Sequence, residues 1–334
     1  MTNPLIEDLT LEAIRARWHA LAGDIVRTPM VPMEGGVPGA AATLLKLETV
    51  QHTGTFKARG ALSSARAIPP DRRAAGITAA SAGNHAIAAA WAARASGIAA
   101  RVVMQNTANP FRVARARDMG AEVILRDPGA ATFGEAERLS REEGMTFIHP
   151  FDGRDTVLGT GGIGLEMLKD APDVDAVVVS VGGAGLIGGV AAAIKLTNPA
   201  CAVYGVEPEG ADSMARSLAA GAPVTLDRVQ TVADSLAPPM ALPLGHALCA
   251  AYVDDIVRVS DDAICGGMVI LAEDAKLAVE PAAGAAIAGA YGPLRDRLAG
   301  KRVGVIVCGA NIDARGYADL AARGIDPAGA LRAG

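Results

Sequence analysis

Short apolar runs alternate with alanine-rich helical stretches along nearly the whole chain of 334 residues. The apolar runs show little polar alternation, which is typical of strands buried on both faces of a parallel sheet. Helices between such strands cover both faces of the sheet. The pattern therefore predicts an α/β protein with parallel sheets covered by helices. The predicted strands are TLLKLE (43–48), GITAAS (76–81), ARVVMQ (100–105), AEVILR (121–126), DAVVVSV (175–181), AVYGVE (202–207) and RVGVIVCG (302–309).

Composition argues against several classes of protein. The net charge is -5 and no basic stripe occurs, so we expect no nucleic-acid partner. The cysteines are widely spaced, without a CxxC pair, which argues against a zinc site or a disulfide framework and fits a reducing, cytoplasmic compartment. The N-terminal stretch reads as a capped amphipathic helix rather than a signal peptide.

One segment imitates a membrane span. Residues 176–194 carry no charge, and their number meets the length criterion for a transmembrane helix. The segment opens with the β-branched run VVVSV and then breaks at GGAG. A buried strand, a glycine turn and a helix explain this pattern better, so we expect no membrane segment there.

Polar and glycine-rich residues follow three of the predicted strands. They are Ser81 to His85, Gly182 to Gly185, and Cys308 to Asn311. In parallel α/β sheets, ligands bind outside the carboxyl ends of the strands. We therefore expect these three loops to contribute to one site.

The glycine turn at 182–189 admits more than one interpretation. Free backbone N–H groups at a helix start suit a phosphate, whereas tight packing of strand on helix is the structural alternative. Residues 183–188 formally match GxGxxG, and Glu207 lies 19 residues beyond Gly188. Taken alone, this dinucleotide pattern would support an NAD(P) dehydrogenase.

Lys57 lies in the segment KLETVQHTGTFKARGA (46–61), which follows a predicted strand and starts a predicted helix. A cation in the first turn of a helix is disfavoured by the helix dipole. If this lysine is also screened from water, its pKa falls and its neutral amine becomes available as nucleophile and base. A surface lysine is the alternative, and position alone leaves the choice open.

Four segments together resemble the fold-type II pyridoxal phosphate (PLP) enzymes, specifically the threonine/serine dehydratase and serine racemase family. In that family the lysine that matches Lys57 forms the Schiff base. SAGNHA (81–86) resembles the loop for the substrate carboxylate and cofactor, GGAGL (182–186) the phosphate loop, and VCGANID (307–313) the pyridine-nitrogen loop. Their order and spacing also match over nearly the whole chain, whereas the dinucleotide interpretation explains one element alone.

The resemblance implies a PLP-dependent lyase that removes water from a small hydroxy-amino acid and yields a 2-oxo acid and ammonia. L-threonine and L-serine are the implied substrates, and a hydroxyaspartate dehydratase or an amino-acid racemase is the alternative. Residues 1–69 and 148–334 would form the large PLP-binding domain, and 70–147 an inserted small domain. The resemblance also leads us to expect a homodimer.

The resemblance assigns roles to individual residues. Lys57 would hold PLP and take the Cα proton, Asn84 would hydrogen-bond the ring 3-oxygen, and Phe56 would pack against the ring. Cys308 could not strongly protonate the pyridine nitrogen, which favours elimination. The implied cofactor-binding residues are Phe56, Lys57, Asn84, Gly182, Gly183, Ala184, Gly185, Leu186 and Cys308, and the implied substrate-binding residues are Ser81, Ala82, Gly83, Asn84 and His85.

Three residues depart from the family pattern near the expected site. Ala82 stands where serine racemases carry a serine, which argues against racemisation. Ala184 replaces a glycine of the phosphate loop, and we expect a methyl group to be tolerated there only if φ stays negative. Ser235 replaces a common glycine, and its hydroxyl is expected within reach of substrate or cofactor.

Other polar residues have less specific interpretations. Glu207 and Ala211 resemble part of a divalent-cation loop, but Ser213 occupies the last ligand position, so waters would have to complete the shell. His85 is interpreted as structuring its loop rather than as a general base. Arg154 either binds a second substrate carboxylate or is a solvated loop residue.

Overall fold

The computed structural model describes residues 3–334, which form two sheets covered by helices. The larger sheet has the order β1-β2-β10-β7-β8-β9, and all its neighbouring strands are parallel except the antiparallel pair β1 and β2. Its strands are β1 (Met30–Pro32), β2 (Ala42–Leu47), β7 (Ala176–Ser180), β8 (Ala202–Pro208), β9 (Asp255–Val259) and β10 (Arg302–Val307). The smaller sheet is fully parallel, with the order β5-β4-β3-β6. Its strands are β3 (Ile77–Ala80), β4 (Ala100–Gln105), β5 (Glu122–Arg126) and β6 (Thr146–Phe147).

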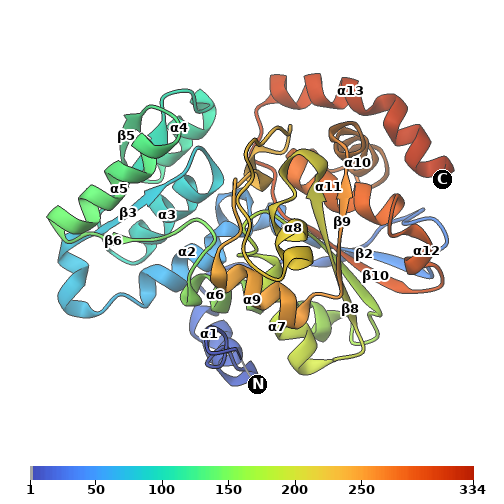
Figure 1. Ribbon diagram of the computed structural model, residues 1–334, viewed down its shortest axis with the longest axis horizontal. Helices are drawn as coiled ribbons and strands as arrows, with labels where there is room; N and C mark the ends of the chain where they lie inside the picture. Colours follow the sequence, from blue (N-terminus) through green and yellow to red (C-terminus); the bar gives the residue numbers. More distant parts are fainter. Residues whose placement is uncertain (1–2) are drawn as a thin grey trace.

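Helices cover both faces of each sheet (Figure 1). The helices are α1 (Leu11–Leu21), α2 (Lys57–Arg66), α3 (Asn84–Ala95), α4 (Pro110–Asp118), α5 (Ala130–Glu143), α6 (Arg154–Asp170), α7 (Ile187–Thr197), α8 (Ser213–Ala220), α9 (Pro243–Tyr252), α10 (Asp261–Asp274), α11 (Pro281–Tyr291), α12 (Arg295–Leu298) and α13 (Ala314–Ala333). In the larger unit α11 packs directly on β7, β8 and β10, and α10 and α13 lie outside it. In the smaller unit α3 and α5 pack on β3 and β4.

All seven predicted strands are present, with ends that differ by at most two residues. They were recognisable because they are apolar throughout; β7, for example, is buried along its whole length. Three strands were not predicted. β1 and β6 are only three and two residues long, and β9 is a sheet edge whose exposed Asp255 and Arg258 interrupt the apolar pattern.

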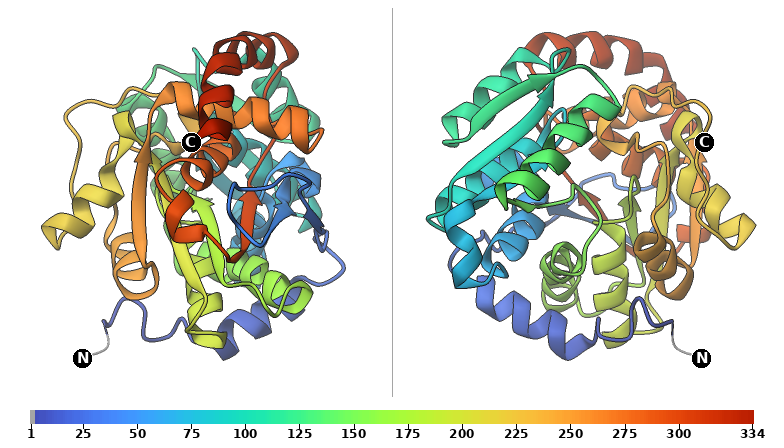
Figure 2. Two further views of the ribbon diagram at one scale, coloured as in Figure 1. Left: turned by 90° about the vertical axis from the view of Figure 1, so that its right-hand side faces the viewer. Right: turned by 60° about the vertical axis from the view of Figure 1, so that its left-hand side comes forward.

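The four strands of the smaller sheet all fall between residues 77 and 147, within the predicted small domain. Figure 2 shows this teal and green unit beside the larger one, with α1 at the base. Helix α2 joins the two units, because it packs against α3 on one side and α6 on the other. The domain limits at 70 and 147 themselves stay a prediction.

The segment that imitates a membrane span is β7, the glycine turn and α7, as the sequence indicates. Among residues 3–334, no helix combines the length and the apolar character needed to cross a bilayer.

Candidate active site

Two adjoining cavities lie where the loops after β3, β7 and β10 meet the start of α2. They share Lys57, Asn84, Phe151 and Ser235 as lining residues. The first, which we call the cofactor cavity, is lined by Phe56, Lys57, Asn84, Phe151, Ser180, Gly182, Gly183, Ala184, Gly185, Leu186, Ile187, Ser235, Leu236, Glu280, Ala282 and Cys308. The second, the substrate cavity, is lined by Lys57, Ala80, Ser81, Ala82, Gly83, Asn84, His85, Gln105, Arg112, Thr132, Phe133, Pro150, Phe151, Asp234, Ser235, Ala237 and Pro238.

The structure therefore brings the residues implied by the family resemblance together. Every implied cofactor-binding residue lines the cofactor cavity, and every implied substrate-binding residue lines the substrate cavity. Ser235 lines both. Their individual roles stay predictions.

Lys57 is the first residue of α2, and its amine projects into both cavities. A tight turn precedes it, in which Thr53 and Gly54 have φ of 67° and 73°. The Nζ of Lys57 donates a hydrogen bond to the Pro150 carbonyl at 2.5 Å. Burial lowers the pKa of this amine to about 8. Roughly a tenth of the amine is thus neutral at pH 7, far more than in an ordinary lysine, and this neutral form is the one that acts as nucleophile or base.

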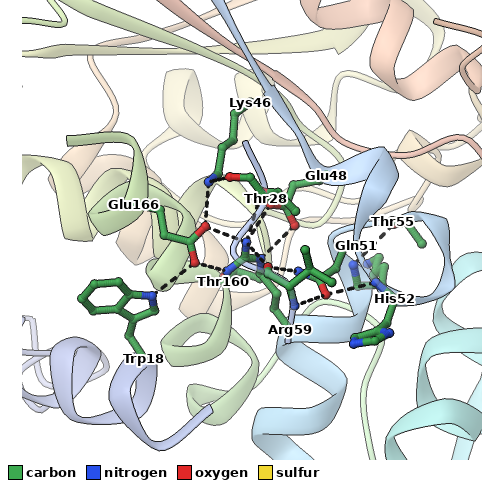
Figure 3. A network of polar contacts seen from close by, with 12 residues as sticks. Trp18, Thr28, Lys46, Glu48, Gln51, His52, Thr55, Arg59, Thr160 and Glu166 are labelled. Carbon is green, nitrogen blue, oxygen red and sulfur yellow. Dashed lines mark hydrogen bonds and ion pairs between the residues drawn. The ribbon is translucent and has the colours of Figure 1, made fainter. Parts of the chain in front are cut away.

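A buried charge cluster, formed by Lys46, Glu48, Arg59 and Glu166, fixes the start of α2 (Figure 3). The Arg59 guanidinium donates to Glu48 at 2.8 Å and to Glu166 at 2.7 Å. Lys46 donates to the second Glu166 oxygen at 2.6 Å. Two cations and two anions thus neutralise one another away from water, and they connect β2, α2 and α6 only two residues from Lys57.

The glycine turn after β7 presents the start of α7 to the cofactor cavity. Leu186, the N-cap residue of α7, provides no side-chain hydrogen bond to the first N–H groups of the helix. Such an uncapped helix start suits an anion. With the partly neutral amine of Lys57 lining the same cavity, this set of groups fits the phosphate and the aldehyde of PLP.

The expectation for Ala184 was wrong. Its φ is 67°, in the left-handed region, and its side chain is buried. Gly183 and Gly185 flank it, and a Cβ on either would collide with Phe151. The packing of the turn against Phe151 therefore imposes the backbone conformation in spite of the methyl group, at a cost of about 1–2 kcal/mol.

The loop after β3 is organised from within the protein. The Ser81 hydroxyl accepts a hydrogen bond from Gly83 N–H at 3.1 Å. His85 Nε2 lies 2.8 Å from the Ile148 carbonyl, and burial lowers the His85 pKa to about 3, so the ring is neutral and donates there. This placement agrees with the loop-structuring interpretation of His85.

Three residues suggested from the sequence line neither cavity. Arg154 forms an ion pair with Asp8 on the surface, which agrees with its interpretation as a solvated residue, and a role toward a second substrate carboxylate stays a prediction. The Glu207 carboxylate accepts the N–H groups of Met214 and Ala215 at 2.9 and 2.8 Å. It thereby caps α8 and is not free to bind a ribose. Within residues 3–334 no group of three or more His, Cys, Asp or Glu side chains is arranged to hold a metal, so a cation at Glu207 and Ala211 stays a prediction.

Sequence reasoning missed three charged residues of the site, Arg112, Asp234 and Glu280. Arg112, on α4, lines the substrate cavity and pairs with Asp234. Glu280 lines the cofactor cavity and is only 2% exposed. The signal for Glu280 was present, since it is an acid within the apolar run LAVEPAAGAA. Arg112 carried no such signal, because PFRVARARD contains three arginines and only the fold distinguishes them.

Aromatic rings gather at the substrate cavity. We call Phe133, Phe147, His149 and Phe151 the aromatic wall. His149 contacts the Phe151 ring edge-on, with centroids 4.6 Å apart, and its centroid lies 6.2 Å from that of Phe133. Phe133 and Phe151 line the cavity, and Phe133 keeps 39% of its surface exposed. Because the chain has only five phenylalanines, three in this wall are a marked concentration.

The sequence and the fold of the chain are both similar to those of known proteins. Residues 21–309 match the family described as pyridoxal-phosphate dependent enzyme. The chain is 50% identical to a phenylserine dehydratase of Ralstonia pickettii over 84% of this chain and 86% of the relative. It is 37% identical to an L-threonine ammonia-lyase of Thermotoga maritima over 91% of this chain and 76% of the relative. The solved structure of maize serine racemase superposes with a TM-score of 0.87 at 33% identity, covering 91% of this chain and 96% of that one.

Proposed function

The chain belongs to the pyridoxal-phosphate dependent enzymes, and we propose that it eliminates water from a 3-hydroxy amino acid with an aromatic side chain. This choice of side chain rests on Phe133 and Phe151, the two residues of the aromatic wall that line the substrate cavity. An aryl group beside Phe133 gains buried area and ring-to-ring contact, whereas the methyl group of threonine would leave the wall largely unused. The phenylserine dehydratase relative supports the same choice. The homodimer expected from the sequence stays part of the proposal.

PLP supplies the electron sink when it is bound. The chain provides the remaining groups. The uncapped start of α7 would hold the phosphate, and Asn84 and Cys308, which line the same cavity, would bind the ring. The Lys57 amine would hold the cofactor and, when released from it, would be the base that takes the Cα proton of the substrate. The Pro150 carbonyl keeps that amine in place between the two cavities.

The substrate carboxylate fits the loop of residues 81–85. Gly83 is the N-cap residue of α3 and offers no side chain to the first N–H groups of that helix, which are therefore available to an anion. A Cβ on Gly83 would lie 2.9 Å from an Arg112 nitrogen, so glycine allows this cation to approach the loop. Ala82 provides no acid, which favours elimination over racemisation.

The proposal is tested by 2-oxo acid release from PLP-loaded protein with 3-phenylserine, threonine, serine and 3-hydroxyaspartate isomers. We expect kcat/KM to be highest for a 3-phenylserine isomer. Phe133→Ala should lower it by about tenfold and leave the value for threonine nearly unchanged, since only the aryl substrate loses ring contact and buried area.

Phe111→Ala is the matched control, because Phe111 is 40% exposed on α4 and lines neither cavity. It should change neither value. A higher kcat/KM for threonine than for every 3-phenylserine isomer would overturn the aryl assignment. Interconversion of enantiomers without 2-oxo acid release would overturn elimination itself.

A further inference from the structure

Glu280 is a buried acid for which the proposed reaction has given no role. Its carboxylate lies in the wall of the cofactor cavity, and a Cβ on Gly309 would come within 2.6 Å of Oε1, so glycine leaves room for it. Within residues 3–334 it forms no ion pair with a lysine or arginine. Glu48 and Glu166 are equally buried but paired with Arg59. An unpaired buried carboxylate is costly, which implies a function at this place.

The hydrogen-bond partner of Glu280 is the side-chain amide of Asn84. Asn84 Nδ2 lies 2.8 Å from both oxygens of Glu280. At its other end, Asn84 Oδ1 accepts from Asn311 Nδ2 at 2.9 Å, and Asn311 Nδ2 also donates to the Thr53 carbonyl. The Asn84 amide is therefore held from both sides, and its orientation is fixed by an acceptor on its nitrogen and a donor on its oxygen.

The geometry leaves one Asn84 hydrogen without a partner. The two N–H bonds of an amide point in different directions, and the two oxygens of one carboxylate are too close together for each to accept from a different one. A single Asn84 N–H therefore donates to both Glu280 oxygens. The second N–H is left for an acceptor in the cavity. We propose that Glu280 is a positioning residue for the cofactor, which holds the Asn84 amide so that its free N–H faces the ring oxygen of PLP. This inference rests on PLP binding but not on the identity of the substrate.

The protonation of Glu280 provides a second property by which its role can be tested. Burial, helped by nearby Asp234, raises the pKa of Glu280, and Arg112, the Asn84 hydrogen bond and Lys57 oppose that rise, so that the resulting pKa is about 7. The buried Cys308 thiol is the remaining titratable group that faces it, and burial raises the pKa of that thiol too. The carboxylate therefore changes charge near neutral pH, beside the ring of the cofactor.

The test measures PLP binding to the apo-protein in the absence of substrate, by titration of the visible absorbance. Glu280→Ala frees the Asn84 nitrogen and should raise the Kd for PLP by about tenfold, as expected when the hydrogen bond that orients the amide is lost. Glu280→Gln retains an acceptor for Asn84 without the charge, and should stay within about threefold of the parent. The absorbance of bound PLP should titrate near pH 7 in the parent and not in Glu280→Gln.

Asn311→Ala releases the opposite end of the Asn84 amide and should raise the Kd by a similar factor. This variant keeps the test decisive if Glu280→Ala does not fold. A Kd and spectrum for Glu280→Ala that match those of the parent would overturn the inference. Equal weakening in Glu280→Ala and Glu280→Gln would also overturn it, because the charge rather than the orientation of Asn84 would then be what matters. Neither outcome bears on substrate choice, so a failure here is distinguishable from a failure of the proposed reaction.

Discussion

Lys57 is activated by burial rather than by an adjacent base. Its Nζ has the Pro150 carbonyl as its hydrogen-bond acceptor, and the loss of hydration brings its pKa down from 10.5 to about 8. Cys308 and Glu280 act in the opposite direction but do not outweigh burial. A carbonyl acceptor orients the amine without stabilising its charged form as a carboxylate would.

The rate of covalent PLP attachment to the apo-protein should therefore rise with pH through about pH 8 and then level off, because the neutral amine is the nucleophile. Stopped-flow absorbance from about pH 6.5 to about pH 10 measures this rate. An ordinary lysine would instead give a rate that keeps rising about tenfold per pH unit across the same range. Lys57→Ala provides the control, in which no attachment should occur.

The residues of the site differ in how far the sequence could predict them. Lys57, Asn84 and Cys308 lie in segments whose order along the chain is diagnostic, so their convergence was predictable. Glu280, the N-cap residue of α11, and Arg112 on α4 reach the site through tertiary packing alone. The φ of Ala184 was mispredicted because local preference favours negative φ, whereas contact of the turn with Phe151 decides the conformation.

At the scale of elements, the buried charge cluster ties α2 to α6 and β2. Glu166 is the shared anion, since it accepts from Lys46, Arg59 and Trp18. Breaking a buried ion pair from one side leaves an uncompensated charge, which is far more costly than losing a surface pair.

Glu166→Gln should accordingly lower the free energy of unfolding in urea by about 3–5 kcal/mol, because Lys46 and Arg59 then share a single buried anion. Adding Lys46→Met to this variant removes the excess cation and should recover part of the loss. Glu142→Gln is the control, in which an exposed carboxylate paired with Arg138 is neutralised with little effect. A loss in Glu166→Gln no greater than in this control would contradict the prediction.

Strand content was more predictable than strand order. Apolar runs such as β7 and β10 identify buried strands from local sequence. The order β1-β2-β10-β7-β8-β9, however, places a strand from the end of the chain beside one from the beginning. Such pairing depends on how helices distant in sequence, such as α11, pack on the strands of the sheet, which no local pattern records.

At the scale of the whole molecule, an ion pair and hydrogen bonds connect α4 of the smaller sheet unit to loops of the larger unit beside the substrate cavity. The Arg112 guanidinium pairs with Asp234 and donates to the Asn311 carbonyl at 3.1 Å. Asn109, the N-cap residue of α4, donates to Asp313 at 2.5 Å. Asp234 is 56% exposed in its side chain, so its pair with Arg112 contributes modestly and can open readily.

Asp234→Asn should therefore loosen α4 without unfolding the protein, because Arg112 keeps its bond to Asn311. Hydrogen–deuterium exchange of Pro110–Asp118 should accelerate by about two- to fivefold, the factor expected from an ion pair of this exposure. Asp262→Asn is the matched control, since it removes an exposed pair with Arg323 inside the larger unit and should leave α4 unchanged. Unchanged exchange in Asp234→Asn, or equal acceleration in both variants, would show that the two units are held together by packing through α2 rather than by this pair.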